Sequence, residues 1–224
     1  MRHYRLHQEL VELLITQGAD VDGPVQQYCS PLAEAIENSH GGIVQMLMSA
    51  GADVNTKKGG YGHALSSAVR QRDKGMVIRL LRAGADVNLP PDCNNDSALC
   101  KASELGDAEL TRLLIDEGAD IYFRRQSWAQ SALDAAAKKA PVDIIRVLLK
   151  EVDIIKPSSE TQHLVSQAFL TAAQNGRADV VRFFLDEALE ALSAGIIAEA
   201  LKEAVDKDYH GVVDACLNKR ATRL

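Results

Sequence analysis

A short phrase recurs along the chain at a nearly constant interval. It reads SAGADVN at Ser49–Asn55 and RAGADVN at Arg82–Asn88, with weaker copies QGADVD at Gln17–Asp22 and EGADIY at Glu117–Tyr122. The glycines of these copies, Gly18, Gly51, Gly84 and Gly118, are separated by 33, 33 and 34 residues. Self-similarity at such a period is typical of repeat proteins, in which each unit packs only against its neighbours.

The segments between the phrases align with one another without gaps and have a helical pattern. Their first residues are Ser30, His63, Ser97, Ser131, Gln167 and Glu199. Leu32, Ala35 and Ile36 follow the spacing of one amphipathic helix, and the run Ile43–Met48 follows that of a second. Each unit is therefore predicted to be helix–turn–helix. Phe169, Phe183 and Phe184 align with core positions, as does Leu81 in a second helix.

The ends of the predicted helices have matching signals. Ser30 followed by Pro31 is a helix start, because the serine oxygen can cap free N–H groups and proline at the first turn loses no hydrogen bond. Each marker glycine follows a second helix, where the chain usually takes a left-handed conformation. An extended loop is expected after it.

The pattern resembles the ankyrin repeat, written TPLH near its start and LL-x-x-GADVN at its end. SPLAEA and GADVN are the closest matches, and the resemblance covers almost the entire chain. It implies an all-α solenoid of stacked helix–turn–helix units with hairpin loops. GGYGHAL is similar to a variant in the ankyrin tails of fungal NOD-like receptors and related stand-alone fungal proteins. The histidine of TPLH is replaced by Ala33, Ser66, Cys100 and Asp134, so the family's bridge between repeats is absent or rebuilt.

We expect one domain, 1–224, made of successive repeats. The divisions are a partial or capping repeat at 1–22, repeats at 23–55, 56–88, 89–122 and 123–156, an irregular repeat at 157–188 and a C-terminal capping repeat at 189–224. Extrapolated backward, the period places the end of one helix and a second helix within Arg2–Thr16, which fits either a fragment or a shortened cap. Val152 and Ala188 replace the marker glycine, and the connector Val152–Ser166 is expected to be long and rebuilt.

Composition narrows the classes of function. The net charge of −6 and pI near 5.5 disfavour a general nucleic-acid binder, which usually has a basic footprint. No apolar run approaches the roughly 18–20 residues that cross a bilayer. The cysteines are scattered without a zinc or CxxC spacing and are interpreted as reduced thiols. We therefore expect an intracellular protein, cytoplasmic or nuclear, monomeric, without membrane, metal or cofactor.

No catalytic motif is present, neither a glycine-rich phosphate loop nor GxSxG nor HExxH. Asp20, Asp53, Asp86 and Asp120 could suggest a metal ladder, but each has the same place in its loop, which favours loop hydrogen bonds. The alternative to a binding protein is an enzyme whose site lies in the concave groove near Glu34, Glu37 and Asp134. Histidines such as His40 match turn positions and are interpreted as structural.

Large rings and cations in the loops point to a binding surface. In the resembled family the hairpin tips lie beside the concave face where partners bind, and aromatic and arginine side chains are enriched in binding hot spots. We predict non-catalytic recognition of a protein or peptide partner, of acidic character, through the concave face and hairpin tips. A variant of this prediction is that the chain is the recognition part of a larger intracellular protein. The alternative is that Trp128 folds back on its own loop and the arginines are solvated. The predicted partner-binding residues are Tyr28, Tyr61, Arg70, Arg72, Tyr122, Phe123, Arg124, Arg125, Trp128, Lys138 and Lys139.

Overall fold

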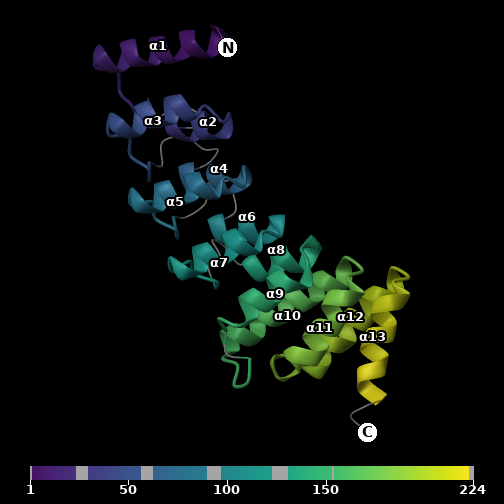
Figure 1. Cartoon of the computed structure of the whole chain (residues 1–224). Helices are drawn as coiled ribbons and strands as arrows, with labels where there is room; N and C mark the ends of the chain where they lie inside the picture. The colour runs from purple at the N-terminus through teal and green to yellow at the C-terminus, as the bar shows by residue number, and fades with distance from the viewer. Residues whose placement is uncertain are drawn as a thin grey trace. The chain divides into compact units, whose positions relative to one another are not determined.

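The structure is a computed structural model that describes residues 2–23, 30–56, 63–89, 97–122, 131–152 and 154–221. Within these ranges the chain is helical with connecting turns, and it has no β-strand (Figure 1). The all-α prediction is therefore confirmed. None of the helices in the described part of the chain is long and apolar enough to span a bilayer.

The helices alternate between two positions of the repeat, which we call first and second helices. The first helices are α2 (Pro31–Glu37), α4 (Ala64–Arg70), α6 (Ala98–Leu105), α8 (Ala132–Lys139), α10 (Ser159–Gln174) and α12 (Ala194–Asp206). The second helices are α1 (Arg2–Thr16), α3 (Gly41–Ser49), α5 (Lys74–Arg82), α7 (Ala108–Asp116), α9 (Val142–Leu149), α11 (Ala178–Glu187) and α13 (His210–Ala221). A short 3₁₀ helix, η1 (Leu189–Ala191), follows α11.

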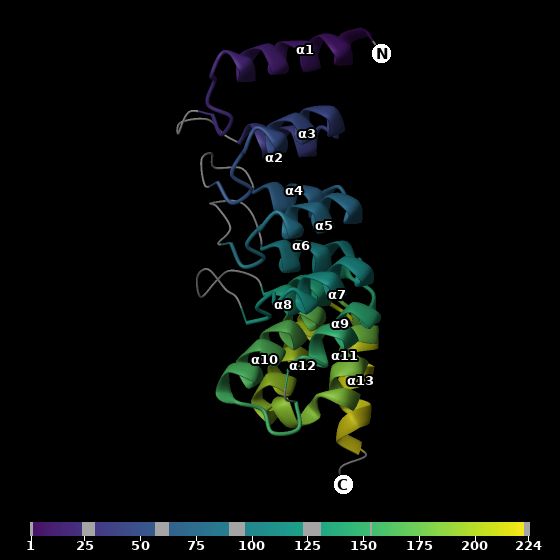
Figure 2. The ribbon, with the colours of Figure 1, turned by 60° about the vertical axis from the view of Figure 1, so that its left-hand side comes forward.

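The chain forms two compact units, Met1–Ala98 and Leu99–Leu224. In the first unit α2 packs against α3 and α4, α4 packs against α5, and α1 packs against α3. In the second unit α10 lies between α8 and α12 in one layer, while α9 contacts α7 and α11 contacts α13 in the other (Figure 2). Small side chains make this close stacking possible, since Ala33, Ala68, Ala136, Ala168 and Ala200 on the first helices are fully buried.

The predicted helix starts and stops are confirmed where the structure describes them. Ser30 precedes α2 and its Oγ accepts a hydrogen bond of 3.1 Å from Ala33 N. Ser131 and Asp134 exchange hydrogen bonds as a capping box at the start of α8. Gly51 has φ of 84° directly after α3, the left-handed conformation that costs a non-glycine residue roughly 1–2 kcal/mol.

Two expectations about irregular segments were wrong. Arg2–Thr16 is one continuous helix rather than the end of one helix and a second helix, because neither glycine nor proline interrupts it. The segment up to Ser166 is not all connector: α10 begins at Ser159, after Ser158 Oγ accepts a hydrogen bond of 3.1 Å from Thr161 N. Leu164 and Val165 are buried, and their burial stabilises the turns of α10 that precede Ser166. The repeat boundaries themselves remain a prediction.

Candidate functional site

The predicted binding residues divide into two groups. Those outside the described residues are Tyr28, Tyr61, Phe123, Arg124, Arg125 and Trp128. Those that the structure places are Arg70, Arg72, Tyr122, Lys138 and Lys139. All of the placed cations lie at the C-terminal ends of first helices or in the turn that follows, so these ends define the candidate site in each unit.

In the first unit Arg70 connects two successive repeats. It is the last residue of α4, and its Nη2 lies 2.9 Å from Glu37 Oε2 at the end of α2. The same nitrogen donates a hydrogen bond of 3.0 Å to Ser67 Oγ. Gln71 adds a bond of 2.9 Å from its Nε2 to the Glu37 carbonyl oxygen. The guanidinium of Arg70 therefore holds two successive repeats together. Only its remaining exposed edge can contact a partner.

Arg72 lies in the turn between α4 and α5 with its backbone in the left-handed region, at φ of 55°. The aligned residues Ser39 (φ 56°), Gly106 (φ 71°), Gly176 (φ 70°) and Asp208 (φ 60°) have the same conformation, whereas the aligned Ala140 is extended, at φ of −75°. Glycine tolerates this conformation without a steric cost, whereas a bulky residue there is uncommon. The Arg72 side chain is exposed. The chain thus keeps a long cationic side chain at a position where glycine fits the backbone better.

In the second unit Glu104 bridges two lysines on successive first helices. Its carboxylate accepts from Lys101 Nζ at 2.6 Å and lies 2.7 Å from Lys139 Nζ. The hydrogen bond from Lys101, followed by that from Lys139, lowers the pKa of Glu104 from 4.5 to about 2. Lys138 is exposed beside this cluster. As in the first unit, one predicted binding cation is held by a glutamate of the same unit.

The Glu104 cluster predicts a pH-dependent loss of stability. The folded pKa is depressed, so the stabilisation is complete above pH 4.5 and is lost as the pH falls toward 2, because the unfolded chain takes up the proton first. Above pH 4.5, Glu104→Gln should cost up to about 1 kcal/mol, a small value because water screens partly exposed ion pairs. Urea unfolding followed by circular dichroism should show that the free energies of unfolding of the wild type and of Glu104→Gln become equal near pH 2. Glu117→Gln, at the exposed end of α7, controls for loss of one charge, and a difference that persists unchanged at pH 2 would contradict this assignment.

Tyr122 is less available than a hairpin-tip residue was expected to be. Its ring is half-buried, and its hydroxyl lies 3.0 Å from Thr161 Oγ1 at the start of α10. Its backbone N–H donates to Asp120 Oδ1 at 2.9 Å. Thr161 is buried, so the phenol connects the end of one repeat to a first helix 39 residues further along the chain.

The aspartate ladder has the structural role that the sequence favours. Asp20, Asp53, Asp86 and Asp120 each accept a hydrogen bond from the backbone N–H two residues later, at 2.9–3.0 Å. The next hairpin is bound as well: Asp53 N donates to Asp22 Oδ1 at 2.8 Å, and Asp86 N donates to Asn55 Oδ1 at 2.7 Å. The ladder carboxylates shape their own loops, while the side chains of Asp22 and Asn55 connect successive loops in the first unit.

The carboxylates considered for an enzyme site also have structural partners. Glu34 Oε1 accepts from Asn38 Nδ2 at 2.9 Å, Glu37 binds Arg70, and Asp134 accepts from Ser131 N and Oγ. Glu34 and Glu37 belong to the first unit and Asp134 to the second. Across the described ranges, no three His, Cys, Asp or Glu side chains are grouped as a metal site would need.

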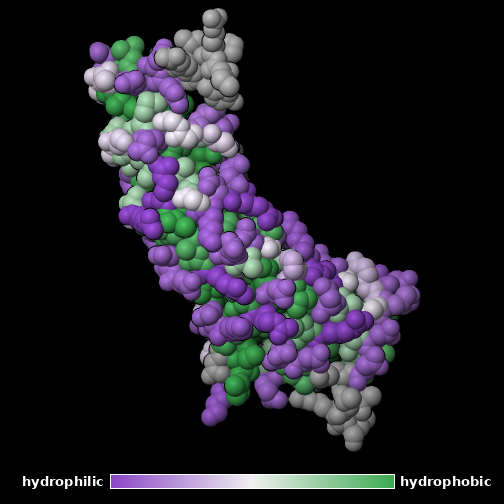
Figure 3. All heavy atoms as spheres, viewed as in Figure 1, coloured by the Kyte–Doolittle hydropathy of each residue, from purple (hydrophilic) through white to green (hydrophobic). Residues whose placement is uncertain are grey.

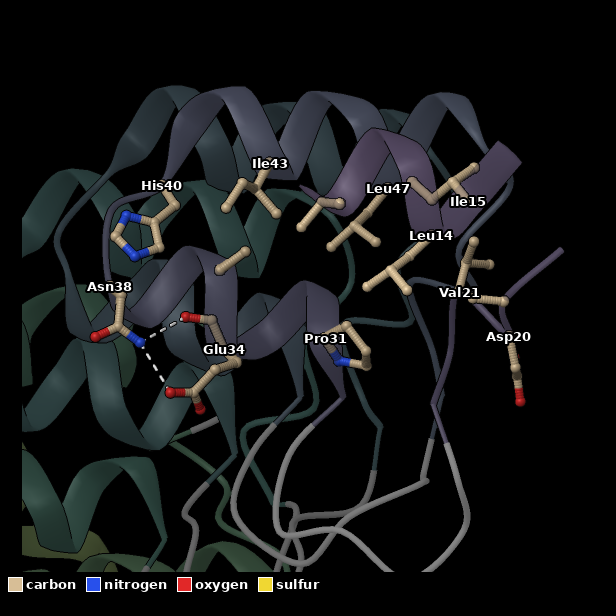
Figure 4. Close-up of a pocket in the computed structure, with 13 residues that line it drawn as sticks. Leu14, Ile15, Asp20, Val21, Pro31, Glu34, Asn38, His40, Ile43 and Leu47 are labelled. Carbon is tan, nitrogen blue, oxygen red and sulfur yellow. Dashed lines mark hydrogen bonds between the residues drawn. The ribbon is translucent and has the colours of Figure 1, made fainter. Parts of the chain in front are cut away.

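Sequence reasoning missed one feature, an apolar groove beside α1. It is lined by residues of α1, α2 and α3, among them Leu14, Ala35, Ile43 and Leu47 (Figure 4). The signal was present, because Leu10, Leu13 and Leu14 align with the apolar residues Ile43, Met46 and Leu47 of α3. The apolar pattern of α1 therefore already indicated an apolar surface on this helix.

Comparison with known proteins agrees with the geometry. Residues 65–158 match the family described as ankyrin repeats (3 copies). No curated protein matches the sequence significantly. The similarity of GGYGHAL to fungal receptor tails stays a prediction, and most of that segment lies outside the described residues. Residues 65–158 are therefore ankyrin repeats, and the helix pairs on both sides of them and the left-handed glycines after second helices continue the same repeat pattern.

Proposed function

We propose that the protein is a non-catalytic protein–protein interaction module that binds its partner through the turn ends of its first helices and the adjoining hairpin loops. Ankyrin repeats are in general protein-interaction modules. The observation that supports this face in particular is Arg72, an exposed arginine in a left-handed turn. A residue held at a conformational cost is a reason to look for a function that needs it.

The proposed partner presents an acidic segment to this face. Arg72 in the first unit and Lys138 in the second are exposed cations, although the whole chain has a net charge of −6. Glu37 and Glu104 hold Arg70 and Lys139 in fixed positions beside them. Complementary charge steers encounter and selects the partner more than it adds affinity. The proposed surface also includes Tyr28, Tyr61, Tyr122, Phe123, Arg124, Arg125 and Trp128.

We propose that the protein acts as a monomer in the cytoplasm or nucleus. Two of its cysteines, Cys100 and Cys216, are buried thiols that form no disulfide. Disulfides are rare in these compartments because their reducing conditions keep cysteines as thiols.

Exchange of Arg72 tests the proposed face. Arg72→Asn removes the charge but keeps a residue that tolerates the left-handed turn, so the free energy of unfolding should change by less than about 0.5 kcal/mol. Binding of partner proteins, measured by quantitative affinity purification with the full chain as bait, should weaken about five- to tenfold. Lys138→Glu should act in the same direction.

Arg82→Asn is the matched control for this experiment. Arg82 is an exposed arginine of the same unit but lies at the end of the second helix α5. If Arg72→Asn and Lys138→Glu retain the same partners in the same amounts as Arg82→Asn, the proposed face is wrong.

A further inference from the structure

A second groove lies between α9 and α11, within the repeats of the second unit. Further second helices pack beyond both of its walls, α7 against α9 and α13 against α11. The volume of the groove is about 430 Å³. Arg146 and Leu149 of α9, with Lys150 at its C-cap, form one wall, and α11 forms the other with Phe183 and Glu187. The connector between α9 and α10 closes the third side, so the groove belongs to one unit.

The connector exposes apolar side chains that regular hairpins bury. The hairpins after α3 and α7 bury the apolar residue of the repeated phrase, since Val54 is 8% exposed and Ile121 is 7% exposed. In the connector, Ile154 is half-buried and Ile155 is 80% exposed. Figure 3 shows hydrophobic residues at the surface where the chain passes from α9 to α10. A partner that covers Ile155 would therefore remove a large aliphatic side chain from water, which favours binding.

The rest of the apolar lining is held in place by packing. Leu149 and Val152 also line the groove, and they are only 4% and 7% exposed. Phe183 is half-buried, and its ring meets that of Phe184 edge to face, with centroids 6.4 Å apart. Ligand sites are typically preformed hollows with an apolar lining and a few polar groups that fix the orientation of the ligand. The groove thus offers a preformed surface for an apolar side chain.

The charges along the α9 wall decide which partner fits. Arg146 and Lys150 are both exposed, and because they are four residues apart they lie on the same side of the helix. The Arg146 guanidinium carbon lies 4.9 Å from the Phe183 ring centroid. Within the described ranges neither cation has a carboxylate at ion-pair distance, unlike the cations held by glutamates at the turn ends. Among the described residues that line the groove, Glu187 is the one carboxylate against two cations.

We propose that the groove between α9 and α11 binds an acidic segment of a partner protein that has a large apolar side chain. Carboxylates of the segment pair with Arg146 and Lys150. The apolar side chain packs on Leu149 and Phe183, and the same contact covers Ile155. A protein segment suits the site better than a free small molecule, because Ile155 is so exposed that a ligand confined to the groove would leave it in water. The site lies at the C-terminal ends of second helices and does not depend on the turn ends of first helices proposed above.

A phage-displayed library of random peptides, selected on the full chain, tests the proposal. Prior depletion of the library on the Ile155→Asp chain removes peptides that bind elsewhere, including those that bind the turn ends. The peptides recovered should combine acidic residues with a large apolar residue. The strongest of them, labelled and titrated by fluorescence anisotropy, should bind about tenfold more weakly to Arg146→Glu and to Lys150→Glu, because like charges then oppose one another. Glu187→Lys should strengthen binding about threefold, because it replaces the opposing carboxylate with a third cation.

Two matched variants control for these changes, and both should bind the peptide as the wild type does. Arg112→Glu reverses the same charge at the aligned, exposed position of α7. Val205→Asp places a carboxylate at another exposed apolar position, on α12, where the side chain is 59% exposed. Circular dichroism establishes that each variant is folded before it is titrated.

Recovery of no such peptide, or of basic peptides instead, overturns the proposal. So does an equal loss of affinity in Arg146→Glu and Arg112→Glu. A loss in Arg72→Asn as large as that in Arg146→Glu would assign the peptide to the turn ends and would also overturn it. A dimer of the wild-type chain that Ile155→Asp dissociates in sedimentation would assign the groove to a second copy, again contrary to the proposal.

Discussion

Phe184→Ala should lower the free energy of unfolding by about 3–5 kcal/mol, the range for truncating a fully buried phenylalanine. Phe184 lies on α11 with its side chain completely buried. Its ring meets Phe169 of α10 edge to face, with centroids 6.3 Å apart and planes at 81°. Such a pair adds to the burial of apolar area, and the surrounding helices cannot collapse fully into the space that alanine leaves. Urea unfolding followed by circular dichroism at 222 nm measures the loss.

Phe183→Ala provides the comparison, because it removes the same side chain one residue earlier. Phe183 is only half-buried, and the Arg146 guanidinium lies 4.9 Å from its ring centroid. Its truncation should cost about 1–2 kcal/mol, from partial burial and a cation–π contact. The sequence alignment places both rings in the core, and the structure confirms only Phe184 as fully buried. Equal losses for the two variants would show that α11 is rotated relative to this description.

Leu80→Ala should cost about 2–5 kcal/mol in the first unit. Leu80 lies on α5 and is fully buried, at the position that aligns with Leu47 and Leu114. A chain of repeats makes mainly neighbour contacts, so the cavity weakens its own repeat and the interface with the adjacent one. Hydrogen exchange of the α4 and α5 amides should therefore accelerate together with the fall in global stability.

Leu81→Ala tests which leucine of α5 is buried in the core, Leu80 as in the structure or Leu81 as expected from the sequence. The helical pattern places Leu81 in the core, but its side chain is only half-buried in the structure. Its truncation should cost about 1 kcal/mol, in proportion to the smaller apolar area that it removes from water. If Leu81→Ala proves the more damaging of the two, the side of α5 that faces the core is wrong.

Local features of the fold were predictable because short segments encode them. The serine before α2 and the serine before α8 cap their helices as the sequence suggests. The aspartate ladder follows from the tendency of an aspartate side chain to accept the N–H two residues later. Gly51 and its equivalents end second helices because left-handed backbone suits glycine. Each of these signals needs only a few neighbouring residues.

The candidate site was less predictable, because its charges have partners far along the chain. Arg70 and Lys139 read as free cations in the sequence, yet Glu37 binds one and Glu104 binds the other. Glu37 precedes Arg70 by 33 residues, and Tyr122 reaches Thr161 across 39 residues. Knowing the period does not reveal which side chains face one another between repeats. Arg72 was named from its charge, and only its backbone angle shows that keeping it there is costly.

By itself, the sequence determined that the chain is a stack of helix pairs, since the period, the caps and the apolar spacing are local and recur. Only the tertiary structure decided how the irregular parts are completed. It shows α1 as one helix beside an apolar groove, and α10 as a first helix of 16 residues. The physical reason is that a helix in a repeat array is defined by what packs on each face. Leu14 has the same pattern as Leu47, yet Leu14 is 49% exposed and Leu47 is 4% exposed, because the described part of the chain packs a first helix beside α3 and none in the same place beside α1.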